Sequence, residues 1–285
     1  MQTQRRSKKI LASPYQCGYA CRMFSAAFER ILDLFCPAVC PVCGSVSESG
    51  NLICSACEEK MVTPQNAFCL RCGAKRLDSA ADQPNCLRCR NTAFRFRRAT
   101  ALGNYAAELR SLVLQMKKDK NGISATAVAQ LLVKHRRNEL TAAGADLIVP
   151  VPMSKQRYRM RGVNSPDFLA AEIARLLKIP AALTLVKRIR HTGVQYPLSY
   201  SDRQENVTDA FAMRQPEVFR PGILPRGWFR LLPQVSGRNI LLVDDILTTA
   251  STCNEVSKTL LTAGVKSVTV AVIARAGIAP EEGEW

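Results

Sequence analysis

Two adjacent aspartates, Asp244 and Asp245, stand just before a run of hydroxyl-bearing residues in this 285-residue chain. Paired carboxylates can accept hydrogen bonds from two neighbouring hydroxyl groups of a sugar. A hydroxyl-rich turn that enters a helix offers N–H groups, side-chain donors and a favourable dipole to a phosphate. The two features together predict a site for ribose 5-phosphate; the alternative is that the hydroxyls only cap the helix and the acids face solvent. The turn consists of Thr248, Thr249, Ala250, Ser251 and Thr252.

A second group of residues, after the apolar run 146–151, could bind an anion. Because arginines at alternate positions of an extended loop point in one direction, we expect a basic loop that contacts pyrophosphate or another polyanion. The net charge of +17 also favours polyanionic partners, which include nucleic acids, phosphorylated metabolites and anionic membranes. The alternative is that the basic residues only solvate the surface. The loop carries Lys155, Arg157, Arg159 and Arg161.

Eight of the twelve cysteines form four C-x-x-C pairs. Such a pair turns two thiolates toward one zinc ion, and a second pair completes the tetrahedron. Ten residues separate the first two pairs and thirteen separate the last two, so we expect two sequential zinc ribbons and about two structural Zn²⁺. Cross-braced pairing and redox-active cysteines are the alternatives. The pairs are Cys40/Cys43, Cys54/Cys57, Cys69/Cys72 and Cys86/Cys89.

The elements that position these residues alternate between strand and helix. Residues 239–243 form an apolar strand that ends at the two aspartates, and a helix to about Ala263 leads to the strand 267–274. The apolar run 146–151 precedes the basic loop, and a helix capped by Ser165 then continues to about Leu177. Buried strands joined by helices predict a parallel sheet with both faces covered, an α/β fold.

The first part of the chain differs from this α/β part in composition. Residues 1–21 are basic and lack periodicity, so we expect a flexible tail. Residues 22–35 place apolar side chains at helical spacing, so we expect a module over 22–92 that contains this helix and both ribbons. No run of 18 apolar residues and no signal-peptide core are present, so we expect a cytoplasmic protein without a transmembrane segment.

Three stretches resemble a known family. LLVDDILTTAST resembles the phosphoribosyl pyrophosphate (PRPP) loop of type I phosphoribosyltransferases, and IVPVPMSKQRYRMRGVNSPDFLA resembles a signature of the ComF family of competence proteins and their GntX relatives. The resemblance covers roughly residues 31–275, including the cysteine knuckles and the segment around Tyr105 and Lys117. It implies a type I phosphoribosyltransferase fold over 93–285, C-terminal to the zinc-ribbon domain. A further stretch follows the flexible-loop pattern of the family, with Arg188, Arg190, Thr192, Gln195, Leu198, Arg203 and Asn206.

The resemblance also implies roles for the residues of the site. Asp244 and Asp245 would be the catalytic pair that holds the 2′- and 3′-hydroxyls, and residues 248–252 would surround the 5-phosphate. The basic loop would face pyrophosphate, with Mg²⁺ held mainly by oxygens of PRPP. Arg188, Arg190, Gln195 and Arg203 would belong to the flexible loop of the family. Ala250 departs from the family, which has Gly there, and a left-handed alanine would cost about 1 kcal/mol.

Two functions follow from the resemblance. The first is binding of PRPP or a phosphorylated ribose in a protein that serves uptake of single-stranded DNA during natural transformation. The implied partners are then single-stranded DNA and the DNA-uptake helicase machinery. The second is an active phosphoribosyltransferase that transfers phosphoribose from PRPP to an unidentified acceptor in nucleotide metabolism. Purine salvage is the weaker variant, because no motif in the chain specifies a base pocket.

Overall fold

The computed structural model describes residues 39–47, 51–76, 86, 89–90, 92–190, 207–214 and 234–276. The expected tail over 1–21 and the expected helix over 22–35 lie outside the described residues, as do Gln195 and Arg203. In the described part, no helix is both long and apolar enough to span a bilayer.

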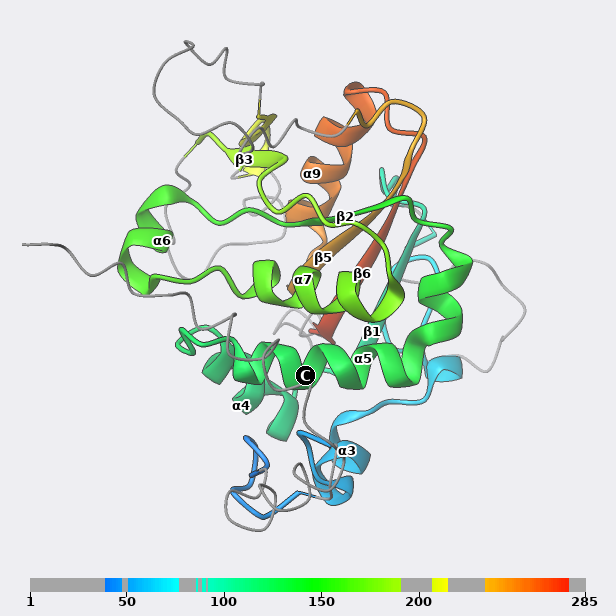
Figure 1. The fold of residues 1–285 in the computed structure, drawn as a ribbon. Coiled ribbons are helices and arrows are strands. Elements are labelled where there is room, and N and C mark those ends of the chain that lie inside the picture. The colour runs from blue at the N-terminus through cyan, green and yellow to red at the C-terminus, as the bar shows by residue number, and fades with distance from the viewer. Residues whose placement is uncertain are drawn as a thin grey trace, which may run out of the picture.

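Four parallel strands form the central sheet, in the order β1-β6-β5-β2 (Figure 1). The residues of β6 are buried after its first position, as expected for a strand covered on both faces. The parallel α/β fold predicted from the sequence is therefore confirmed. The strands are β1 (Arg98–Asn104), β2 (Leu147–Pro150), β5 (Asn239–Leu247) and β6 (Ser267–Arg275).

Helices cover the two faces of the sheet unequally (Figure 1). Alternation along β5 sends Leu241 and Val243 into one apolar cluster with three helices, and Leu242 into a second cluster with one helix and a small hairpin. The first face carries α4 (Ala107–Met116), α5 (Ile123–Ala142) and α7 (Ser165–Leu177); the second carries α9 (Ser251–Thr262) and the antiparallel strands β3 (Val186–Arg188) and β4 (Phe211–Met213).

The first cysteine ribbon packs into the core of the sheet domain. Its helix α3 (Ser55–Met61) is followed by the short helix η3 (Gln65–Ala67). Cys40, Cys57 and Met61 belong to the same apolar cluster as α4 and α5. A Cβ at Gly103 of β1 would overlap the carbonyl oxygen of Met61, so only glycine permits this approach. The cysteines of the second ribbon form a separate small cluster.

Three local predictions were wrong. The expected basic loop is a helix, α6 (Lys155–Arg161), because Ser154 caps it by accepting the Arg157 N–H and Gly162 ends it in a left-handed conformation. Strand β5 runs past the two aspartates to Leu247, since hydrogen bonding to β6 continues there.

The N-cap of α7 is Asn164 and not Ser165, which is already helical. The Asn164 side-chain amide is buried and donates to the carbonyl of Val151 (3.3 Å) and to Asp167 Oδ1 (2.6 Å). These bonds tie the start of α7 to the chain that leaves β2, which a cap at Ser165 would not do.

Candidate functional site

Asp244 and Asp245 lie near the carboxyl end of β5, where parallel α/β sheets place their ligand crevices. Asp244 Oδ1 accepts the backbone N–H of Asp245 at 2.9 Å, and the Cys253 thiol lies 3.7 Å from Asp244 Oδ2. Asp245 Oδ2 lies 3.4 Å from Lys117 Nζ, which caps the end of α4. Burial raises the pKa of Asp244 well above its usual range, and the charge of Asp245 raises it further.

The two carboxylates do not form a complete cation site. Oxygen ligands of this type suit Mg²⁺, but Lys117 already pairs with Asp245, and burial disfavours the charged form of Asp244. A magnesium ion that binds here needs further oxygens from a ligand.

Residues 248–252 comprise the turn after β5 and the first two residues of α9, and they are called the phosphate turn below. Ala250 is its left-handed residue, with φ 67°, and it is also the N-cap of α9. Thr249 Oγ1 and Ser251 Oγ lie 2.9 Å apart, and the Asn254 N–H donates to the Ala250 carbonyl at 2.8 Å. The turn thus gathers hydroxyl groups where the N–H groups of α9 begin, a geometry that suits a phosphate.

Arg275, the last residue of β6, binds the backbone of the phosphate turn and of the residues beside it. Its side chain is buried, and Nη1 donates to the carbonyls of Leu247 (2.7 Å), Thr248 and Ala276 (3.1 Å). A buried guanidinium also adds positive potential beneath the turn. Sequence reasoning missed this residue, although an arginine that closes the apolar strand 267–274 was a visible signal.

Helix α6 divides the four predicted basic residues between two sides. Residues four apart share a helical face, so Arg157 and Arg161 lie together, while Arg159 points elsewhere. Arg157 and Arg161 are partly buried, whereas Lys155 and Arg159 are exposed. Burial lowers the pKa of Arg157, and the nearby charge of Arg161 lowers it further. The prediction that three alternate arginines point one way therefore fails.

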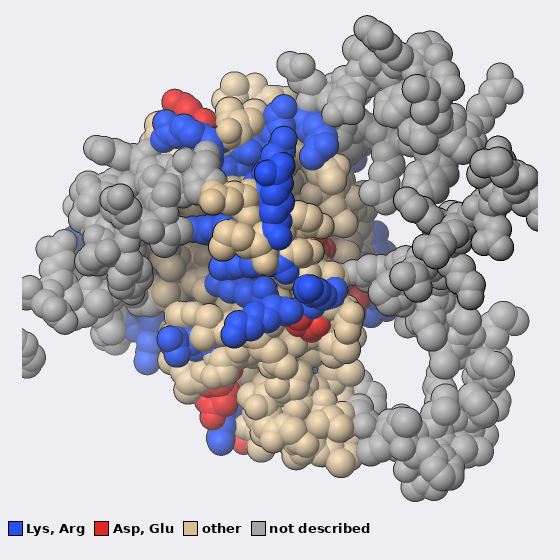
Figure 2. Space-filling view, turned by 90° about the vertical axis from the view of Figure 1, so that its left-hand side faces the viewer, with Lys and Arg blue, Asp and Glu red and all other residues tan. Residues whose placement is uncertain are grey.

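Arg188 of β3 lies near Arg157, on the partly buried side of α6 that is called its inner side below. Burial lowers its pKa, Arg157 lowers it further and Asp244 opposes the shift, so these three charges act on one another. Its guanidinium carbon lies 5.4 Å from the centre of the Phe211 ring. Arg190 is exposed two residues later. Figure 2 shows lysines and arginines gathered in a band on the face that carries α6.

The eight paired cysteines form two sequential tetrads, as the spacing predicted: residues 40, 43, 54 and 57, and residues 69, 72, 86 and 89. Sulfur–sulfur distances between Cys43 and Cys54, and between Cys72 and Cys86, are 3.6 Å. Tetrahedral zinc with Zn–S bonds of about 2.3 Å places its sulfurs about 3.8 Å apart. The left-handed residues Gly44 and Gly73 close matching knuckle turns, so both tetrads fit a structural Zn²⁺.

Comparison with known proteins finds two domain families and close relatives over most of the chain. The double zinc ribbon domain matches residues 31–93, and the phosphoribosyl transferase domain matches residues 168–283. Competence protein F of Haemophilus influenzae is 29% identical over 236 residues, 82% of this chain and 94% of that protein. DNA utilization protein YhgH of Escherichia coli is 30% identical over 243 residues, 84% of this chain and 97% of that protein.

Among solved structures, a hypoxanthine phosphoribosyltransferase from Staphylococcus aureus matches with a TM-score of 0.33 and 13% identity. The match covers 56% of this chain and 70% of that one.

Proposed function

Because the chain belongs to the ComF family, we propose that it binds PRPP, or another ligand that contains ribose 5-phosphate, at the carboxyl end of β5. One observation carries this proposal: Asp244 and Asp245 stand immediately before a turn whose hydroxyl groups and helix N-terminus suit a phosphate. The acids can accept hydrogen bonds from vicinal ribose hydroxyls while the turn holds the 5-phosphate.

The second anionic part of PRPP, its pyrophosphate, would face the inner side of α6. Arg157 and Arg161 share that side, and Arg188 lies close enough for its charge to act on Arg157. Arginine suits this role because its planar fork donates two parallel hydrogen bonds to phosphate oxygens. Mg²⁺ would arrive with the ligand and complete its coordination with ligand oxygens.

The names of the relatives support a role for this protein in DNA utilization. One relative is named a competence protein and the other a DNA utilization protein, so the names associate the family with competence and with DNA utilization. We extend to this chain a role in the uptake of single-stranded DNA, with the DNA-uptake helicase machinery as a partner. The cytoplasm is the fitting compartment, because structural zinc thiolates need a reducing environment.

Calorimetric titration of the full chain with PRPP and Mg²⁺ tests the ligand, and a parallel series with a single-stranded oligonucleotide tests the link to DNA. Saturable PRPP binding that the oligonucleotide strengthens or weakens supports both parts. Two bound ligands that influence each other must do so reciprocally. Failure of PRPP, ribose 5-phosphate and nucleotides all to bind would refute the proposal.

An active phosphoribosyltransferase is the second candidate. The inner arginines of α6 favour it, since departure of pyrophosphate from the anomeric carbon needs charge stabilisation more than a covalent nucleophile. The acceptor would attack the anomeric carbon as the bond to pyrophosphate breaks. Release of pyrophosphate over a panel of bases, amines and nucleic-acid ends distinguishes an enzyme from a binding protein.

A further inference from the structure

We propose that a second basic surface, far from the phosphate turn, binds the phosphate backbone of a single-stranded nucleic acid. It lies on the second zinc ribbon and on the amino-terminal end of β1, and we call it the ribbon-edge surface. The proposal takes only the class of partner from the proposed function; its location comes from the residues themselves. The surface comprises Lys75, Arg90, Arg95, Arg97 and Arg98, all exposed.

One buried and one partly buried phenylalanine anchor the segment that carries the arginines of this surface. Phe96 is 1% exposed, and its ring stacks on that of Phe94 at a centroid distance of 4.8 Å. The residues between and after them, Arg95, Arg97 and Arg98, are exposed. The apolar rings therefore anchor a segment whose charged side chains remain in solvent.

Arg71, which lies inside the Cys69/Cys72 knuckle, fixes the same segment to the zinc ribbon. Its guanidinium donates to the carbonyls of Phe94 (2.9 Å), Phe96 and Arg97 (3.3 Å). It also lies 5.4 Å and 5.6 Å from the centres of the two phenylalanine rings. Because the backbone is already held, a ligand does not have to order it on binding.

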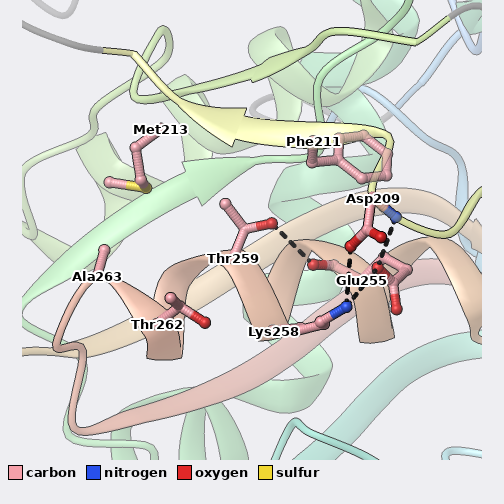
Figure 3. A pocket seen from close by; sticks show the side chains of 8 residues that line it. All are labelled: Asp209, Phe211, Met213, Glu255, Lys258, Thr259, Thr262 and Ala263. Carbon is pink, nitrogen blue, oxygen red and sulfur yellow. Dashed lines mark hydrogen bonds and ion pairs between the residues drawn. The ribbon is translucent and has the colours of Figure 1, made fainter.

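The described residues of the two segments that form this surface carry no acidic side chain to offset its positive charge. The described residues of 66–76 and 86–98 contain no Asp or Glu. The Arg95 N–H donates to Asn254 of α9, and the acid beside it, Glu255, shares Lys258 with Asp209 at 3.8 Å and 3.0 Å (Figure 3). Asp146 immediately precedes β2, which two strands separate from β1. The arginines therefore remain available to an external polyanion.

The chemistry of the surface favours nucleic-acid phosphates over bases. Phe96 is buried and its ring stacks on the partly buried ring of Phe94, so the two stacked faces are not open to bases. Contacts made by exposed arginines to phosphates are independent of base sequence and release counterions. Binding at this surface is therefore sensitive to salt and indifferent to sequence.

The position of the surface makes it separable from the ribose phosphate site. Arg97 and Arg98 stand where β1 meets the start of β6, at Val268 and Thr269. The phosphate turn follows Leu247, at the other end of the sheet. Strands β5 and β6 each span nine residues, which is about 30 Å of extended chain. A nucleic acid at this edge can bind while a small ligand occupies the turn.

The test uses the full zinc-loaded chain and a fluorescent oligothymidine of about 20 nucleotides, titrated between about 50 and 200 mM salt. The variant carries Arg95→Gln, Arg97→Gln and Arg98→Gln. The control carries Arg110→Gln, Arg137→Gln and Lys178→Gln, three exposed residues on α4, on α5 and after α7, so its net charge changes equally. We expect the first variant to lower the salt slope by about 2, since each lost contact on a single strand removes about 0.7.

Three results would overturn the proposal: an unchanged slope in the first variant, an equal drop in the control, or no binding by the parent chain. Competition by polyglutamate as strong as that by DNA would also overturn it, since it would indicate an acidic protein partner. Titration of each variant with ribose 5-phosphate keeps the two proposals apart. Loss of DNA binding with retained ribose 5-phosphate binding places the two ligands at separate sites.

Discussion

Lys117 Nζ lies 3.4 Å from Asp245 Oδ2, and this ion pair joins the end of α4 to β5, the strand that carries the paired acids. Both side chains are mostly buried, at 21% and 16% exposure. A partly buried pair is screened less by salt than a surface pair. The ion pair therefore sets the orientation of Asp245 before any ligand arrives. Asp244 has no such cation partner at this distance among the described residues, and burial raises its pKa.

Replacing both acids, Asp244→Asn and Asp245→Asn, should weaken PRPP binding by about 1–3 kcal/mol, the range for hydrogen bonds to charged groups. The fold should survive, because asparagine keeps the size of each side chain and carries no charge that burial would disfavour. Calorimetry with PRPP gives the affinity, and thermal unfolding without ligand gives the stability. Unchanged affinity in a folded variant would show that the ribose hydroxyls bind elsewhere.

Ala250→Gly should stabilise the phosphate turn by up to about 1 kcal/mol, because the left-handed conformation strains alanine and not glycine. PRPP should then bind more tightly. The matched control is Lys178→Gly, which relieves a left-handed residue at the end of α7, away from the turn. It should raise stability and leave PRPP affinity unchanged. Equal effects of both variants on PRPP affinity would contradict the local explanation.

Arg275→Met should weaken binding of ribose 5-phosphate more than binding of ribose, because the turn loses both its clamp and a buried positive charge. Arg275→Lys distinguishes the two contributions. Lysine keeps the charge but cannot reproduce the planar fork of the guanidinium. Calorimetry with both sugars provides the measurement. Recovery with lysine indicates charge, continued loss indicates the clamp, and equal loss of both sugars would argue for general unfolding.

The two sides of α6 should differ in their effect on PRPP. Arg157→Gln with Arg161→Gln removes the partly buried pair and should cost about 1.5 kcal/mol, roughly tenfold in affinity. Lys155→Gln with Arg159→Gln removes the same charge from the exposed side and should cost much less. Titrations at one fixed salt concentration make the comparison. Equal losses would mean that only the overall charge of the helix matters.

Metal analysis should return about two zinc ions per chain, one for each tetrad. Cys40→Ser should lower the midpoint of thermal unfolding by several degrees, because Cys40 shares the apolar cluster of α4 and α5. Cys69→Ser should lower the midpoint less, since the four cysteines of the second tetrad form a small cluster of their own, separate from the clusters of the sheet. Unfolding followed by circular dichroism gives both midpoints. A larger loss with Cys69→Ser would contradict the division of the core.

The parts of this protein that depend on neighbours in the chain could be predicted from the sequence. A C-x-x-C pair turns both sulfurs toward one ion through its own backbone, so the two tetrads followed from spacing. The paired acids and the phosphate turn are contiguous along β5 and α9, so their proximity needed no knowledge of the sheet. Even the capped helix α6 was within reach, since Ser154 and Gly162 are ordinary signals of its two ends.

Only the tertiary structure decided which distant residues complete the site. Lys117 reaches Asp245 because α4 packs beside the sheet, and Arg275 reaches the phosphate turn because β6 pairs with β5. Neither contact can be predicted from the spacing of residues along the chain. The strand order β1-β6-β5-β2 is selected by burial of whole faces of the sheet and not by adjacent residues. The same long-range packing joined the first zinc ribbon to the core and left the second as a separate cluster.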